Sequence, residues 1–166
     1  MKKIFTLSVL LSLLMGCSKQ TADNSVVTNF DLNRFLGSWY EIARFDHKFE
    51  RGMEQTKAMY VLRDDGKVDV LNTGIIDGKL SEAKGLAKLT DTAGLLRVSF
   101  WGPFYSDYRI LLLDNDYQYA LVGSGSDDYL WILSRTPKIS DETKTQILSE
   151  AQKRGYDTNK LIWVKQ

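Results

Sequence analysis

From residue 37 onward, short stretches rich in aromatic and β-branched residues alternate with turn residues at regular spacing. This pattern is typical of an all-β sandwich or barrel. Gly37 opens the first stretch, and Asp64, Asp65 and Gly66 form a hairpin turn in which the glycine can take a positive φ. We predict eight strands: one around Trp39, and seven at 55–63, 67–73, 79–90, 94–101, 105–114, 117–123 and 129–136.

All the predicted connections are short and antiparallel, so the simplest closure is an up-and-down barrel of eight strands. One helix follows, which Ser140 can cap and Gly155 can end. Ile147 and Ala151 share one face of this helix, and we expect that face to pack on the barrel wall. Residues 160–165 form a short final strand. The predicted fold class is therefore all-β, with one C-terminal helix.

Strict alternation divides the first strand into two faces, with Trp39, Glu41 and Ala43 on one and Tyr40, Ile42 and Arg44 on the other. A large indole beside the origin of a strand must be covered by another part of the chain. Just upstream, Asp31 is expected to cap a single helical turn.

Residues 1–16 are typical of a signal peptide. Lys2 and Lys3 precede 12 mostly apolar residues, which are too few for a bilayer-spanning helix of ~20. The segment ending at Cys17 resembles the lipobox of bacterial lipoproteins, whose cysteine becomes a lipid-carrying N-terminus. Ser18 follows in place of the Asp that retains such lipoproteins at the inner membrane, which favours the outer membrane. We expect residues 17–29 to form a lipidated cysteine with a flexible tether, and residues 30–166 to form the folded domain.

The composition excludes several classes of function. Removing Lys2 and Lys3 from the 22 basic residues leaves 20 against 21 acidic residues, a net charge of −1, so no nucleic-acid partner is implied. Cys17 is the sole cysteine, so no intrachain disulfide can form. The sole histidine, His47, lies near Glu50, but one imidazole supplies too few ligands for a metal site. We expect this segment to be a flexible loop whose aromatic residues face the barrel mouth.

The sequence also lacks the features of an enzyme. Gly123-Ser124-Gly125-Ser126 is not a Gly-x-Ser-x-Gly elbow, and no second histidine is present to act as a base. We therefore predict a protein that is not an enzyme and that uses no cofactor.

Several motifs resemble the lipocalin family, and most closely the bacterial outer-membrane lipoprotein lipocalins. The run from Gly37 to Trp39 resembles the Gly-x-Trp signature of the first lipocalin strand, and Arg135 resembles the late arginine that lies over that Trp. Further similarity lies in residues 44–47, 100–104, 116–122 and 131–137. The resemblance implies a lipid-anchored outer-membrane protein that binds or stores fatty acids or lysophospholipids. It also implies that Trp39 and Arg135 form a structural pair closing one end of the barrel.

The resemblance suggests which side chains line the barrel. In related lipocalins a Tyr of the second strand, an Asn of the third and a late Trp face the ligand, and the matching positions are Tyr60, Asn72 and Trp131. Phe100 and Tyr108 complete the expected ligand-binding set. The alternative is that these aromatic residues fill the barrel, which leaves a structural envelope lipoprotein with no ligand. The sequence leaves open whether two copies pair as a homodimer.

Overall fold

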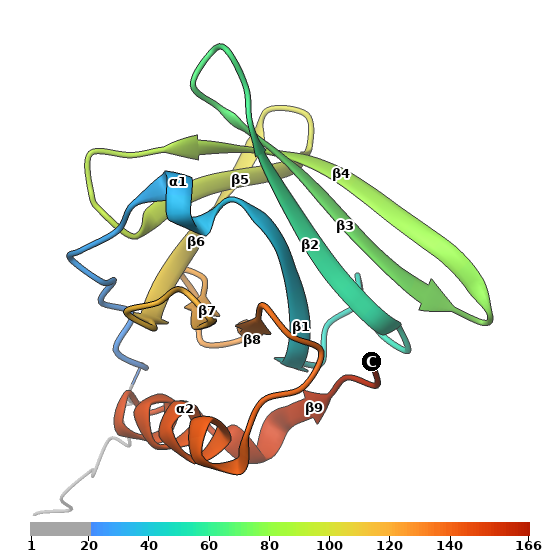
Figure 1. The fold of residues 1–166 in the computed structure, drawn as a ribbon, viewed down its shortest axis with the longest axis vertical. Helices are drawn as coiled ribbons and strands as arrows, with labels where there is room; N and C mark the ends of the chain where they lie inside the picture. Colours follow the sequence, from blue (N-terminus) through green and yellow to red (C-terminus); the bar gives the residue numbers. More distant parts are fainter. Residues whose placement is uncertain (1–20) are drawn as a thin grey trace, which may run out of the picture.

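Eight antiparallel strands close a ring, and one long helix lies against its outer wall (Figure 1). The computed structural model describes residues 21–166. Neighbouring strands follow the order β2-β3-β4-β5-β6-β7-β8-β1, and the ring closes where β1 also pairs with β2. The strands are β1 (Gly37–Phe45), β2 (Glu54–Leu62), β3 (Val68–Ile76), β4 (Lys79–Leu89), β5 (Leu95–Trp101), β6 (Phe104–Leu113), β7 (Tyr119–Gly123) and β8 (Leu130–Ser134).

The remaining elements are α1 (Leu32–Phe35), α2 (Asp141–Lys153), the 3-10 helix η1 (Thr158–Lys160) and β9 (Leu161–Trp163), which pairs with β1 outside the ring. Ser140 caps α2 by accepting a hydrogen bond from the Thr143 amide at 3.1 Å. The predicted all-β barrel of eight strands, with one C-terminal helix and a short last strand, is confirmed.

One strand begins later than expected. Tyr117 was predicted to start the seventh strand, but it takes a φ of 59° and lies in the turn before β7. The Tyr117 amide donates to the carbonyl of Asp114 at 2.9 Å, and the strand begins at Tyr119. Aromatic content favours a strand at this position, and the turn hydrogen bond overrides it.

A β-bulge interrupts the alternation of β1. The register against β8 shifts between Glu41 and Ala43. After this shift Ala43 joins Ile42 in the core beneath α2, while the Arg44 guanidinium lies 2.6 Å from the carboxylate of Glu41. The predicted faces of β1 are therefore wrong from Ala43 onward, because one extra residue reverses the alternation.

Two hydrophobic cores lie on the two sides of the barrel wall. The outer core joins the wall to α2, whose Ile147 and Ala151 are fully buried as expected. The inner core fills the barrel near α1, and its largest members are Phe35, Trp39, Tyr60, Tyr117, Leu96, Ile110 and Leu133.

The end of the barrel beside α1 is closed. Asp31 caps α1 by accepting a hydrogen bond from the Asn33 amide at 2.9 Å. The indole nitrogen of Trp39 donates to the carbonyl of Phe35 at 2.8 Å, and the Arg135 guanidinium lies 3.9 Å from the centroid of the indole. Arg135 also donates hydrogen bonds to the carbonyl oxygens of Arg34, Phe35, Ser38 and Tyr117.

Residues 21–29 lie along the outside of the barrel. Ala22 is buried, and its amide donates to a carboxylate oxygen of Asp127 at 3.0 Å. Further along, the Val27 amide donates to the carbonyl of Ile110 at 2.9 Å. The expected flexible tether is therefore wrong for residues 21–29, because tertiary hydrogen bonds fix a segment that lacks a periodic apolar pattern.

The predicted signal peptide, residues 1–16, and Cys17 lie outside the described residues. All helices and strands from α1 to β9 fall within residues 30–166, the stretch expected to form the folded domain. Between residues 21 and 166, no helix combines the length and the apolar character needed to cross a membrane.

The closed end leads to a prediction about stability. Trp39→Ala should lower the free energy of unfolding by ~3–5 kcal/mol, since a fully buried indole leaves a large void. Arg135→Ala should cost less, and the double variant should cost less than the sum, because the two side chains are in contact. Denaturant unfolding of the three variants measures this coupling. Strict additivity would show that Arg135 does not stabilise the Trp39 indole.

Candidate functional site

The barrel interior becomes more accessible away from α1. Trp39, Ala58, Asn72 and Ala83 are direct cross-strand neighbours, so their side chains share the inner face. Trp39 is fully buried, Ala58 and Asn72 are half-buried, and Ala83 is exposed. The end of the barrel formed by the β1–β2, β3–β4, β5–β6 and β7–β8 loops is therefore open, and we call it the mouth.

Two of the predicted binding residues meet across the barrel. The hydroxyl groups of Tyr60 and Tyr108 lie 2.8 Å apart, although β2 and β6 are on opposite sides of the eight-stranded ring. Tyr60 also contacts Phe35, with ring centroids 5.4 Å apart. Burial raises the pKa of both tyrosines, so both stay neutral at physiological pH. Phe35, Trp39, Tyr60 and Tyr108 form a layer that we call the aromatic floor.

The other predicted residues lie on the mouth side of the interior. Phe100 packs flat against Gly85, where an added Cβ would come within 2.8 Å of the ring. The side-chain oxygen of Asn72 is buried and has no hydrogen-bond partner among the described residues. Trp131 stacks on Tyr129 with ring centroids 5.8 Å apart. The structure thus brings Phe100, Asn72 and Trp131 to the inner face, and their contact with a ligand stays a prediction.

A group of polar side chains is buried beside Trp131. Arg44 donates a hydrogen bond to a carboxyl oxygen of Glu41 at 2.6 Å, and His47 Nε2 lies 2.8 Å from a carboxylate oxygen of Glu50. The Trp131 indole N–H donates to the same oxygen of Glu50 at 3.2 Å. We call Glu41, Arg44, His47 and Glu50 the mouth cluster.

The two carboxyl groups of the mouth cluster have different proton affinities. Burial, helped by the nearby Glu50 carboxylate, raises the pKa of Glu41 to about 8, and Arg44 offsets this only in part. Burial also acts to raise the pKa of Glu50, but the contacts with His47, Trp131 and Arg44 outweigh it, so the pKa of Glu50 is lowered. At neutral pH Glu41 is therefore mostly protonated, whereas Glu50 is ionised.

The sequence did not predict the mouth cluster. Strict alternation placed Glu41 and Arg44 on opposite faces, and only the bulge in β1 brings them together. The available signal was the presence of two charged residues in an otherwise apolar strand. The expected flexible loop after β1 is also corrected: Arg44 donates to the carbonyl oxygens of Glu50 and Met53, and His47 is buried, so the loop is held inward.

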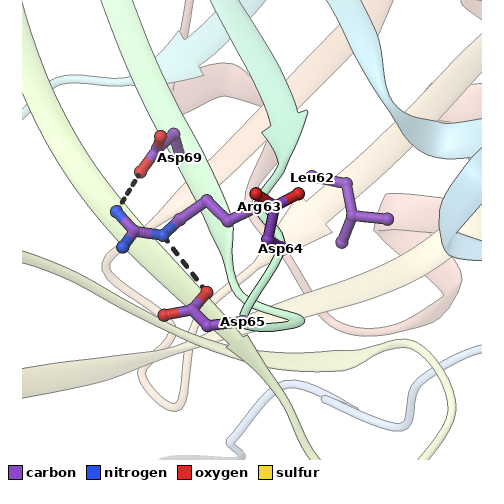
Figure 2. A pocket seen from close by; sticks show the side chains of 5 residues that line it. All are labelled: Leu62, Arg63, Asp64, Asp65 and Asp69. Atoms are coloured by element: carbon purple, nitrogen blue, oxygen red, sulfur yellow. Dashed lines mark hydrogen bonds and ion pairs between the residues drawn. The ribbon is translucent and has the colours of Figure 1, made fainter.

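An exposed pocket lies at the opposite end of the barrel, in the turn between β2 and β3. Figure 2 shows Arg63 reaching both Asp65 and Asp69, each at 3.2 Å. Lys67 hydrogen-bonds Asp65 and lowers the pKa of that carboxyl to about 2. These exposed charges satisfy one another and stabilise the turn. Nowhere in residues 21–166 are three or more His, Cys, Asp or Glu side chains grouped as a metal site would require.

Comparison with known proteins identifies the family. Residues 30–166 match the lipocalin-like domain. The chain belongs to the lipocalin family. The outer membrane lipoprotein Blc of Escherichia coli (strain K12) is 50% identical to this lipocalin over 160 residues, covering 93% of this chain and 90% of that protein. Blc of Vibrio cholerae is 43% identical over 173 residues, covering 100% and 99% of the two chains.

A solved structure shares the fold of this lipocalin. Insecticyanin from the tobacco hornworm Manduca sexta matches with a TM-score of 0.72 at 22% identity, covering 89% of this chain and 86% of that chain. The expected resemblance to outer-membrane lipoprotein lipocalins is confirmed. The lipid-anchored outer-membrane location expected from the sequence is confirmed as well.

The mouth cluster makes stability depend on pH. The unfolded chain releases the Glu41 proton near pH 4.5, whereas the folded protein keeps it up to about pH 8. Between these values the folded state binds the extra proton, so Glu41 makes the free energy of unfolding fall as the pH rises. Glu41→Gln should flatten this slope, which urea unfolding at a series of pH values measures.

A matched control uses another glutamate near the mouth. Glu54 on β2 is exposed and pairs with Lys165 at 3.2 Å, so Glu54→Gln should leave the slope unchanged. If Glu41→Gln and Glu54→Gln alter the slope equally, the Glu41 carboxyl does not carry the effect.

Proposed function

We propose that this lipocalin binds a single-chain lipid, a fatty acid or a lysophospholipid, in the mouth side of its barrel. The observation that carries the proposal is a set of buried polar atoms on the mouth side of the barrel that lack hydrogen-bond partners among residues 21–166. These atoms are Arg44 Nε, His47 Nδ1, Thr56 Oγ1 and Asn72 Oδ1. Buried polar groups are normally hydrogen-bonded, so such a set supports a ligand with a polar head.

The charges of the mouth cluster favour an anionic head group. The Arg44 guanidinium is a cation, and protonation of Glu41 removes one of the two negative charges near it. Protonated Glu41 can itself donate a hydrogen bond. A carboxylate or a phosphate accepts such charge-assisted bonds more strongly than a neutral head group does.

The acyl chain would contact the apolar surfaces of Phe100, Tyr108 and Trp131, which are half-buried on the inner face. Burying about ten methylenes at ~0.8 kcal/mol each gives ~8 kcal/mol, which corresponds to roughly micromolar binding. The cost of ordering the chain subtracts from this value, so low-micromolar affinity is the upper limit we expect.

One observation favours the second candidate function, a structural envelope lipoprotein without a ligand. The contact between Tyr60 and Tyr108 fills the middle of the barrel, as a packed interior would. Solvent extraction of the purified protein followed by mass spectrometry separates the two functions. A co-purified single-chain lipid supports the carrier.

A titration tests binding directly. Fatty acids of increasing length, added to the delipidated protein, should change its tryptophan fluorescence saturably, with affinity rising with chain length. Trp131→Ala should weaken binding, because it removes ring surface beside the mouth cluster. Trp163→Ala is the control, since Trp163 lies on β9 outside the ring and makes a cation–π contact with Lys144. The absence of a saturable signal at every chain length would support the filled barrel.

We also propose that Cys17 carries the lipid anchor, which the names of the lipoprotein relatives support. Cys17→Ala should abolish lipidation and membrane retention. The domain should stay folded, because the hydrogen bonds that Ala22 and Val27 form with the barrel do not involve residue 17. Fractionation of cells, with far-UV circular dichroism of the purified variant, measures both effects. An Ala variant that stays with the outer membrane after high-salt washing would contradict the proposal.

A further inference from the structure

The mouth carries the most exposed large hydrophobic side chains of residues 21–166. Phe104 and Trp101 flank the β5–β6 turn and are 78% and 72% exposed. Phe49 in the β1–β2 loop is 68% exposed, and Leu80 beside the β3–β4 turn is 66% exposed. Three separate loops at the same end of the barrel thus present apolar side chains to solvent. We call these four residues the mouth rim.

The N-terminal segment contacts the barrel at the same end. Ala22 is hydrogen-bonded to Asp127, which lies in the β7–β8 loop at the mouth. Five residues later, Val27 packs against Gly94 in the β4–β5 turn at the closed end, where a Cβ would come within 2.7 Å of the Val27 carbonyl oxygen. The segment therefore runs from the mouth toward the closed end, and its contact at Ala22 lies on the mouth side.

The length of chain before Ala22 limits how the barrel can face its membrane. Cys17 precedes Ala22 by five residues, which span at most ~17 Å when fully extended. A lipid anchor at Cys17 therefore keeps Ala22, and with it the β7–β8 loop of the mouth, within ~17 Å of the bilayer.

We propose that the mouth rim docks on the phospholipid surface that holds the anchor, with Trp101 and Phe104 in the bilayer interface. The inference rests on the proposed lipid anchor at Cys17. Large exposed apolar side chains mark interaction surfaces, and aromatic rings suit the boundary between head groups and acyl chains. The rim consists of separate loop tips that also carry polar residues, such as Asp77 and Lys79 beside Leu80, which suits a deformable lipid interface better than the flat face of a second copy.

A fluorescent label tests the orientation in the full, acylated protein. Phe104→Cys introduces a thiol, which stays the one free thiol when the sulfur of Cys17 carries lipid. The labelled protein, with acylation checked by mass spectrometry, is reconstituted into vesicles of phosphatidylethanolamine and phosphatidylglycerol. An NBD label at residue 104 should shift to shorter wavelength and be quenched by phosphatidylcholine spin-labelled near the head group.

The matched control places the same label at Val61, which is 52% exposed on β2 close to the closed end. Val61→Cys should show neither the shift nor the quenching. Equal signals at the two positions would overturn the inference. A blue-shifted label at residue 104 that transfers energy to a second labelled copy and is not quenched by lipid would also overturn it, in favour of a dimer.

The anchor and the rim fail in different ways. Protein that carries no acyl group at Cys17 would overturn the anchor proposal and the docking inference together. Acylated protein without quenching at residue 104 would overturn the docking inference alone.

Discussion

Arg135 connects segments of the chain that lie far apart in sequence. Its guanidinium covers the Trp39 indole on β1 and donates hydrogen bonds to carbonyl oxygens at the end of α1 and in the turn before β7. Each of these carbonyl groups lies at the end of an element, where it has no partner in a helix or a strand ladder. One side chain therefore satisfies the backbone at the closed end, and the inner core can fill the space behind it.

The closed end and the mouth differ in the polarity of their buried side chains. Near α1 the interior is apolar and packed, so it contributes to stability. At the mouth the β1 bulge turns Arg44 inward and buries its guanidinium, which is costly unless the group is hydrogen-bonded, as it is to Glu41 and to the carbonyl oxygens of Glu50 and Met53. The polar side chains of the mouth cluster are paired within the cluster, yet several of their nitrogen atoms keep unused capacity. Such a site suits recognition better than stability.

The sequence predicted most of the fold because alternation and turn residues are local signals. Eight strands, the helix capped by Ser140 and the last strand were all identified from them. The exceptions depend on tertiary contacts: Tyr117 leaves its strand for a turn, and Ala22 docks on Asp127. In the candidate site, family resemblance gave Tyr60, Asn72 and Trp131 their inward positions. The mouth cluster was missed because a single bulge residue, which has no sequence signature here, decides which way Arg44 points.

The hydrogen bond between Tyr60 and Tyr108 joins opposite walls of the barrel. Strands β2 and β6 cannot move apart at this level without breaking the hydrogen bond. Under the proposed function this hydrogen bond would also limit how deep a ligand lies: an acyl chain that entered from the mouth would stop at the two hydroxyl groups, and any further carbons would stay near the entrance. Selection for chain length would then reside in one pair of phenols rather than in the size of the ring.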